Sequence, residues 1–392
     1  MNAVGIDVSK GKSMVCIMRP FGEVVQSPFE VMHTGSELNS LAKRLKSLRG
    51  ETKIIMEYTG RYYEPVAFAL HKAGLFVSAV HAQLIHDYGN DTIRKVKTDK
   101  ADTVKIANYG LSAWLKLQAW RPEEDLRRQL KVFSRQYNKY SKQRTVLINN
   151  FIALTDQTFP GVNELFTPQP RKSDGHLKWV DFTARFWHCE CINNSSLAVF
   201  EKRYLSWCKK SGYRFSKKKS AEIYAAAREC CCALPKDDVT NLLIQQAVKQ
   251  LNAASETLFA FAGGMLSIAQ QLPEWPVASA FYGVGALLGP QLMAEIGDVR
   301  RFPKKGSLVC FAGLEAPPYS SGKFESKECK ISKQGSPHLR KTLFQIMDIV
   351  LKNAPPDDPI YKFLDRKRTE KSIITPIWPL AAPSFCASIM DA

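Results

Sequence analysis

The stretch MNAVGIDVSKGKSMVCIMRPFGEVVQSPFEV, residues 1–31, decides the fold predicted for the N-terminal part of the chain. It reads as β-strands separated by turns at Gly11-Lys12 and at Phe21-Gly22. Helical spacing follows in residues 37–48 and 63–74, and short apolar strands are predicted at 52–60 and 75–82. Hairpin strands followed by alternating helices and strands are typical of an α/β sheet domain, which we expect over residues 1–118.

A long helix is predicted after Pro122. Apolar residues recur there in alternating steps of four and three, with Arg144 filling one polar position. The seam consists of Leu126, Leu130, Phe133, Tyr137, Tyr140, Leu147, Phe151 and Leu154. We expect a coiled-coil helix over residues 119–157 and a helix over 239–272 that returns antiparallel to it. The inserted segment 158–238 has no assigned role, and its clustered aromatic residues suit a small core better than base stacking.

The charge of the chain indicates a polyanionic partner. The formal net charge is +18, and nucleic acid is the default partner for such an excess. Between Arg127 and Leu154 there are seven basic residues and no acidic one. Such a helix face suits a phosphate backbone, and the alternative is a solvated face on a helix that packs against the protein's own core.

Cysteines and apolar runs restrict the class of protein further. The ten cysteines include no C-x-x-C pair, so the sequence supports neither a zinc finger nor a zinc ribbon, and we expect reduced thiols. The N-terminus has no signal-peptide segment, and no apolar run approaches the length of a membrane span. We therefore expect a cytoplasmic protein without a membrane partner.

Four acidic residues of the N-terminal domain are candidate metal ligands. Asp7 lies in the first predicted strand, Glu57 ends the strand KIIMEY, and Asp99 and Asp102 share one face of a predicted helix. Each of them taken alone would more often be structural. Four close carboxylates repel one another, and two divalent cations, Mg²⁺ or Mn²⁺, relieve this repulsion and serve phosphoryl transfer.

Three sequence blocks carry a resemblance to a known family. GIDVSK, MEYTGRYYEPV and KTDKADTVKIA resemble the D, E and D-x-x-D blocks of the DEDD transposases of insertion-sequence family one-ten, the bridge-RNA-guided recombinases. The stretch from AEIGDVRRF to HLRKTLF resembles the second hallmark domain of that family. The resemblance covers about 1–155 and 275–370. It implies an RNase H-like (RuvC-like) α/β N-terminal domain and a mainly α-helical C-terminal domain at 273–371, followed by an atypical tail at 372–392.

The resemblance also implies a nucleophile. In this family a serine of the C-terminal domain forms a covalent 5′-phosphoserine with DNA, and the carboxylate–metal cluster completes the site. The matching residue in YSSGK is Ser321, and Ser320 is its adjacent rival. We expect basic residues to hold nucleic-acid phosphates, namely Arg127, Arg128, Lys131 and Arg135 on the long helix and Lys333, His338 and Arg340 in ISKQGSPHLRK.

The resemblance thus predicts a prokaryotic, nucleoid-associated recombinase that excises and inserts a mobile element. Its partners would be double-stranded donor and target DNA and a structured bridge RNA. The heptad helix indicates a homodimer, and strand exchange, which needs two cuts per duplex, indicates a tetramer. Two alternatives stay open: a RuvC-like, metal-dependent, structure-selective nuclease that uses water, and a non-catalytic nucleic-acid-binding scaffold.

Overall fold

The computed structural model describes residues 1–58, 60–88, 98–315, 320–321, 324–325 and 331–370. The chain divides into two compact units, Met1–Glu123 and Glu124–Ala392. The predicted atypical tail, 372–392, lies outside the described residues.

The N-terminal unit is built on a five-stranded mixed sheet with strand order β3-β2-β1-β4-β5. The strands are β1 (Asn2–Val8), β2 (Lys12–Met18), β3 (Val24–Met32), β4 (Thr52–Tyr58) and β5 (Phe76–His81). The first three strands pair antiparallel, and β4 and β5 run parallel to β1. At the two predicted turns Gly11 and Gly22 have φ of 80° and 82°, a conformation that glycine adopts without steric cost.

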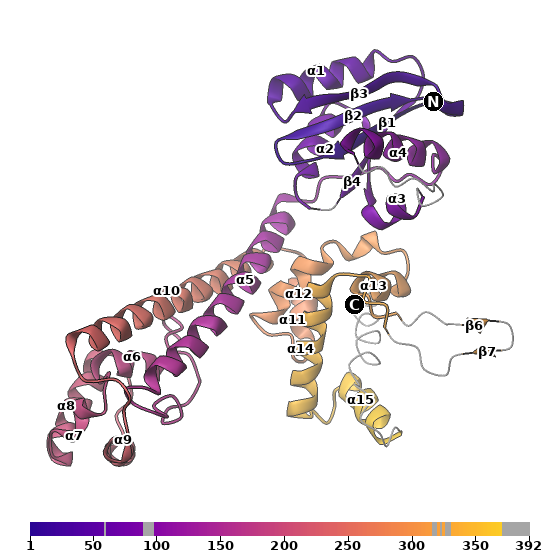
Figure 1. Cartoon of the computed structure of the whole chain (residues 1–392). Helices are drawn as coiled ribbons and strands as arrows, with labels where there is room; N and C mark the ends of the chain where they lie inside the picture. The colour runs from indigo at the N-terminus through magenta and orange to yellow at the C-terminus, as the bar shows by residue number, and fades with distance from the viewer. Residues whose placement is uncertain (59, 89–97, 316–319, 322–323, 326–330, 371–392) are drawn as a thin grey trace. The chain divides into compact units, whose positions relative to one another are not determined.

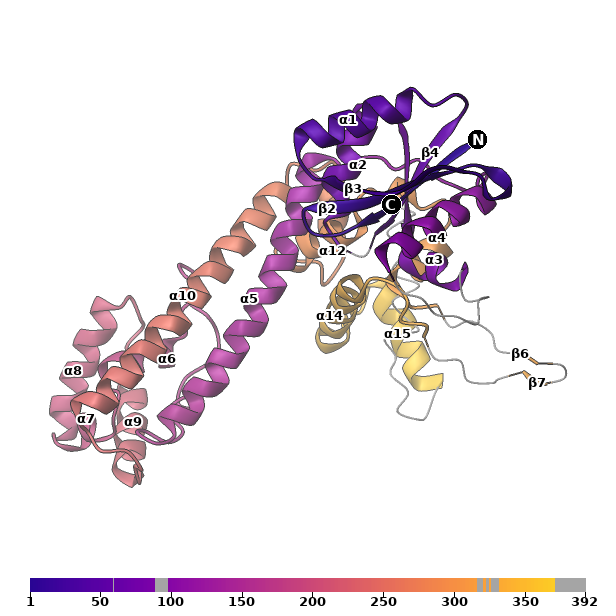
Figure 2. The same cartoon turned by 45° about the horizontal axis from the view of Figure 1, so that its top comes forward.

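Helices cover both faces of this sheet (Figure 2). Helices α1 (Gly35–Lys46) and α2 (Tyr63–Lys72) pack on the face that carries Val4 and Ile6. Helices α3 (Ala82–Tyr88) and α4 (Asp99–Ser112) pack on the opposite face, where Ala3 and Ile55 contact Ile106. Alternate residues of the buried strands therefore pack into two hydrophobic cores, one on each face of the sheet. A sheet of three antiparallel strands extended by two parallel ones, with helices on both faces, is the RNase H-like arrangement, so the predicted fold class is confirmed.

The second unit contains two long helices, α5 (Asp125–Thr155) and α10 (Asp238–Ala269), which lie side by side and antiparallel (Figure 1). The rings of Phe133 and Tyr140 both contact Phe261, and Arg144 Nε donates to Ser255 Oγ at 2.9 Å. Much of the predicted heptad seam thus packs against α10 of the same chain. The predicted homodimer stays a prediction.

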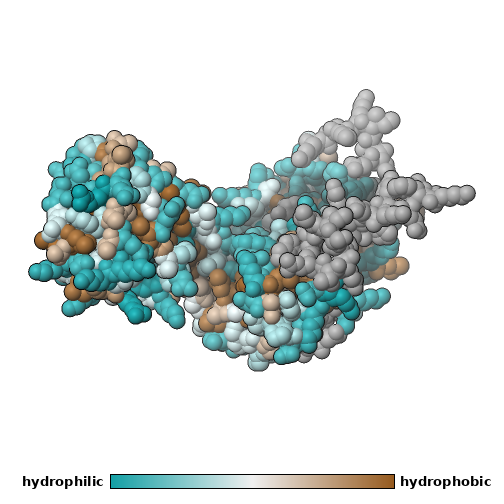
Figure 3. Space-filling model, turned by 90° about the horizontal axis from the view of Figure 1, so that it is seen from below, coloured by the Kyte–Doolittle hydropathy of each residue, from teal (hydrophilic) through white to brown (hydrophobic). Residues whose placement is uncertain are grey.

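Four shorter helices gather at one end of this pair (Figure 1): α6 (Lys178–Arg185), α7 (Glu190–Asn193), α8 (Leu197–Lys210) and α9 (Lys217–Glu229). Their core is aromatic, with Phe182, Phe186, Phe200 and Tyr204 fully buried. Over this part of the surface hydrophilic residues predominate and hydrophobic ones are scattered (Figure 3). The aromatic residues of the inserted segment therefore build a small core, as the sequence favoured.

The remaining elements of the second unit are mainly helical. They are α11 (Trp275–Ala280), α12 (Leu288–Ile296), α13 (Lys305–Ala312), α14 (Pro337–Asn353) and α15 (Pro359–Glu370), with the short strands β6 (Ser320–Ser321) and β7 (Phe324–Glu325). Leu292, Leu308, Leu343 and Ile346 are among the residues of their common core. A mainly α-helical C-terminal region is therefore confirmed. Within the part of the chain that is described, no helix is long and apolar enough to span a membrane.

Candidate active site

Two of the predicted acidic residues lie on neighbouring parallel strands. Asp7 is near the carboxyl end of β1, and Glu57 is near the carboxyl end of β4. The register places Ile6 opposite Met56, so Asp7 and Glu57 are the next residues along the two strands. Laterally adjacent residues of paired strands project from the same face of a sheet, and the two carboxylates therefore share one face.

Glycines let α4 lie directly against that face. A Cβ added to Gly5 of β1 would meet the backbone of Thr103, and Ala107 N at 2.6 Å. A Cβ added to Gly110 would meet Ile55 Cγ1 at 2.7 Å. These close approaches show that α4 runs antiparallel to β1, with its N-terminal end toward the carboxyl ends of β1 and β4.

The direction of α4 also fixes where the other two acidic residues, Asp99 and Asp102, lie. Asp7 lies two residues beyond Gly5, about 6.6 Å along the strand. Asp99 precedes Thr103 by four residues, about 6 Å along the helix. The first turn of α4, which carries Asp99 and Asp102, therefore comes to Asp7 and Glu57. Thr98 caps this turn by accepting from Ala101 N at 3.2 Å, and the helix N-terminus offsets part of the repulsion between the two aspartates.

The four carboxylates act on one another electrostatically. Burial raises the pKa of Asp7 to about 6, and the negative charges of Asp99, Asp102 and Glu57 each add to the shift. Burial also raises the pKa of Glu57, and Asp102 contributes next. The structure thus brings all four predicted acids into one site.

Positive groups oppose this repulsion at Glu57 only in part. Lys105, His81 and His86 lower the pKa of Glu57, but burial and Asp102 outweigh them. The Lys105 ammonium also donates to the His86 carbonyl oxygen at 3.1 Å. Sequence reasoning did not single out the two histidines, which enter the site because β5 and α3 lie beside β4.

Both candidate serines lie in β6. Ser321 is paired with Phe324 and Ser320 with Glu325 in an antiparallel strand pair of the second unit. The choice of Ser321 over Ser320 stays a prediction that rests on the sequence motif.

The basic residues of α5 differ in their burial and in their ion-pair partners. Arg127 is only 6% exposed, and its guanidinium donates to Glu274 at 2.6 Å and to Glu124 at 3.1 Å. This burial contradicts the predicted phosphate contact of Arg127. Arg135 forms two bonds, of 2.6 and 2.8 Å, to the buried carboxylate of Glu295. The expectation of an unbroken positive face fails because Glu274 and Glu295, each more than a hundred residues away from its partner, pair with Arg127 and Arg135.

Other basic residues of the helix remain at the surface. Arg128 is exposed and pairs with Asp125 one turn earlier, and Lys139 and Lys142 are exposed as well. Lys131 is half-buried. The positive charge that α5 offers to a polyanion is therefore reduced to these side chains.

The three basic candidates near α14 also fall into different environments. Burial and the charge of Arg135 lower the pKa of His338, which disfavours the charged ring that a phosphate contact would use. Arg340 donates to the Ala312 carbonyl oxygen at 2.9 Å. Lys333 is exposed, with a left-handed φ of 58°. Of the three, the position of Lys333 fits a phosphate contact best.

Two stretches of the chain match models of transposase families. Residues 4–160 match a model of DEDD transposases, and residues 278–361 match the model described as "Transposase IS116/IS110/IS902 family". The protein is a transposase. It belongs to the IS110 family of DEDD transposases, as the sequence blocks predicted.

Two solved structures are also similar. One is the Thermus thermophilus RuvC structure, with 15% identity and a TM-score of 0.23, covering 30% of this chain and 99% of that chain. The other is T. thermophilus RuvC in complex with Holliday junction substrate, with 14% identity and a TM-score of 0.24, covering 31% of this chain and 99% of that chain. A comparison with curated proteins finds no match.

Proposed function

We propose that this transposase excises and inserts a mobile element by cutting and rejoining DNA, with Asp7, Glu57, Asp99 and Asp102 as the metal-binding part of its active site. The main support is the pKa of Asp7, which is raised to about 6 because burial and three other carboxylates act on one side chain. Grouped like charges with shifted pKa values are typical of functional sites, since they destabilise the fold without a ligand.

The donor set suits a hard divalent cation. All four side chains offer carboxylate oxygens, which Mg²⁺ and Mn²⁺ prefer, and two ions per site would balance four negative charges. Among the described residues, the one group of three ligand atoms within 4.8 Å of one another lies elsewhere, at His188, Cys189 and Cys232. An ion held by three of the carboxylates would therefore draw these side chains together. When bound, such ions supply Lewis-acid catalysis to phosphoryl transfer.

We assign the nucleophile to Ser321. In the proposed step its Oγ attacks the scissile phosphorus, the hydroxyl proton departs, and the O3′ of DNA leaves, which yields a 5′-phosphoserine and a free 3′-OH. Reversal of this step on a second duplex would rejoin the strands. A serine hydroxyl is a weak nucleophile alone, so the proposal requires the carboxylate–metal site to act with it.

The proposed partners are donor and target DNA and a structured bridge RNA, bound by a dimer that assembles to a tetramer. The net charge of +18 and the exposed Arg128, Lys139, Lys142 and Lys333 support a polyanionic partner. Sequencing of RNA that co-purifies with the protein tests the guide: a discrete RNA from the element end supports it, and random fragments contradict it.

Two substitutions test the chemistry. With Asp102→Asn we expect loss of DNA cleavage and retention of DNA binding, because a metal ligand is lost while the basic surface stays. With Ser321→Ala we expect loss of covalent protein–DNA adduct and of recombinant product, whereas the neighbouring control Ser320→Ala retains both. Recombination by Ser321→Ala would refute the serine assignment, and cleavage by the wild type without any adduct would identify water as the nucleophile.

A further inference from the structure

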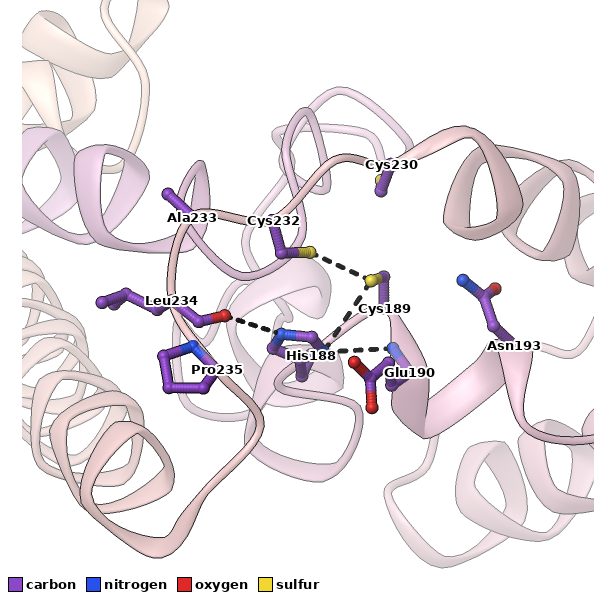
Figure 4. Close-up of a pocket in the computed structure, with 9 residues that line it drawn as sticks. All are labelled: His188, Cys189, Glu190, Asn193, Cys230, Cys232, Ala233, Leu234 and Pro235. Carbon is purple, nitrogen blue, oxygen red and sulfur yellow. Dashed lines mark hydrogen bonds between the residues drawn. The ribbon is translucent and has the colours of Figure 1, made fainter.

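The helices between α5 and α10 contain a side-chain cluster that DNA cleavage does not require. His188 and Cys189 directly precede α7, and Cys232 lies in the connection between α9 and α10. Their ligand atoms all lie within 4.8 Å of one another (Figure 4). Cys189 Sγ is 3.0 Å from Cys232 Sγ and 3.7 Å from His188 Nδ1. Side chains from two segments that are 43 residues apart in sequence thus converge on one point.

We propose that His188, Cys189 and Cys232 bind a structural Zn²⁺ ion. Thiolate and imidazole are the ligands that zinc prefers, whereas the hard Mg²⁺ and Mn²⁺ ions assigned to the carboxylate site prefer oxygen. The thiol of Cys230 lines the same pocket (Figure 4) but donates to the Ala226 carbonyl oxygen at 3.2 Å and is not among the three ligand atoms within 4.8 Å of one another. A Cys₃His set would require this side chain to turn toward the cluster.

The hydrogen bonds of His188 prepare the ring for a metal. Its Nε2 lies 3.1 Å from the Leu234 carbonyl oxygen, and its Nδ1 faces Cys189 (Figure 4). A proton on Nε2 satisfies the first contact and leaves Nδ1 as the acceptor nitrogen of the ring. Metal-ligating histidines commonly donate their other N–H to a carbonyl in this way. Nδ1 accepts from the Glu190 backbone N–H at 3.2 Å, and an ion bound to Nδ1 would replace this hydrogen bond.

The backbone around the cluster is fixed by the residues that directly follow α5. The Thr158 carbonyl oxygen accepts from Cys189 N at 3.0 Å and from Cys232 Sγ at 3.0 Å. The Gln157 carbonyl oxygen accepts from the backbone N–H groups of Ala233 and Leu234, both at 3.0 Å. The two ligand-bearing segments are therefore held together by main-chain contacts, which lowers the entropy that metal binding must overcome.

Zinc at this position would have a structural role. It would join the start of α7 to the connection between α9 and α10 and so close the loop that contains α7, α8 and α9. A cross-link of this kind stabilises a fold by restricting the unfolded chain, and zinc also contributes its own binding free energy. The inference does not depend on the proposed recombination chemistry.

Zinc content measured on the purified full-length chain tests the proposal. We expect about one Zn²⁺ per chain in the wild type, and at least a tenfold lower content in Cys232→Ser because thiolate ligands dominate zinc affinity. Cys231→Ser is the matched control, since Cys231 is exposed and adjacent, and it should keep its zinc. Asp102→Asn should also keep its zinc, which separates this site from the carboxylate site.

A second measurement uses the unmutated chain, in case Cys232→Ser fails to fold. Exchange of zinc for Co²⁺ should produce thiolate-to-cobalt charge-transfer absorption. Removal of zinc by a chelator should speed amide hydrogen exchange in α7–α9 and leave exchange in β1 and β4 unchanged. A folded wild type that takes up no zinc on supplementation, zinc content unchanged in Cys232→Ser, or a Cys189–Cys232 disulfide found by mass spectrometry in place of zinc would each overturn the proposal.

Discussion

Replacing Asp7 by Asn should stabilise the metal-free N-terminal unit while abolishing DNA cleavage. The side chain keeps its shape but loses the charge that burial destabilises most and that Asp99, Asp102 and Glu57 also repel. The same charge is what a divalent cation would bind. The substitution therefore separates the effect of the Asp7 charge on folding free energy from its effect on DNA cleavage.

The raised pKa of Asp7 sets the size of the stabilisation expected for Asp7→Asn. The pKa of Asp7 rises from 3.8 to about 6. At 1.36 kcal/mol per pKa unit, this difference corresponds to at most about 3 kcal/mol of unfolding free energy at neutral pH. Asp7 is partly exposed, and solvent screening reduces the expected gain for Asp7→Asn to about 1–2 kcal/mol.

The pH dependence has a definite sign. Because the pKa of Asp7 is higher in the folded than in the unfolded chain, the folded chain binds more protons between pH 3.8 and about 6. The contribution of Asp7 to stability therefore falls as the pH rises through this range, and its cost is complete above it. The advantage of Asp7→Asn should be full at pH 7.5 and nearly absent at pH 4.

Amide hydrogen exchange of β1 and β4 in chelator measures this effect locally. A gain of about 1–2 kcal/mol slows exchange about 5–30-fold at pH 7.5. Mg²⁺ should slow exchange in the wild type more than in Asp7→Asn, because the variant has lost a ligand. The matched control is Asp87→Asn, the same chemical change at an exposed position of α3, for which we expect less than about a twofold change.

Two results would refute this reasoning. Equal exchange of β1 and β4 in wild type and Asp7→Asn at pH 7.5 would show that the ionised Asp7 carboxylate does not destabilise the folded chain through burial and repulsion. An equally large difference at pH 4 would show that the gain has a cause other than ionisation of Asp7.

Two further predictions concern packing. Gly5→Ala should press α4 away from β1, destabilise the N-terminal unit by about 1–3 kcal/mol and reduce DNA cleavage. The control Gly35→Ala adds its methyl group to open space and should match the wild type. Urea unfolding and cleavage assays measure both variants. Arg135→Met should leave the carboxylate of Glu295, which is 2% exposed, without its cationic partner and lower the unfolding free energy by about 3 kcal/mol. Restoration of stability by the added substitution Glu295→Leu would support the pairing, and an unchanged urea midpoint in Arg135→Met would contradict it.

Local patterns were sufficient for the elements of the sheet. The turns at Gly11 and Gly22 and the apolar strands around Ile6 and Ile55 follow from residue type and spacing over a few positions. These features are set by backbone sterics and by the alternation of buried side chains, which act between neighbours in sequence. The motif blocks also named the four acids that the fold brings together.

The ion-pair partners of the basic residues in α5 could not be predicted from local sequence patterns. The basic run of α5 looked uncompensated because its partners, Glu274 and Glu295, lie more than a hundred residues further along the chain. Arg127 and Arg135 are consequently engaged inside the protein. Exposure and ion pairing depend on which helices pack together, and no local count of charges contains this information.

The cysteines likewise show what sequence determines and what only the tertiary structure determines. The chain has no C-x-x-C pair, and the H-C-x-C and C-C-C runs were the available signal of a zinc site. Sequence alone determined which residue types the chain offers: four carboxylates in one domain, two short thiol-bearing runs in another. Tertiary structure alone decided which of them meet. Close contact requires α4 to lie on Gly5 of β1, and it requires Gln157 and Thr158, after α5, to hold Cys189 beside Cys232.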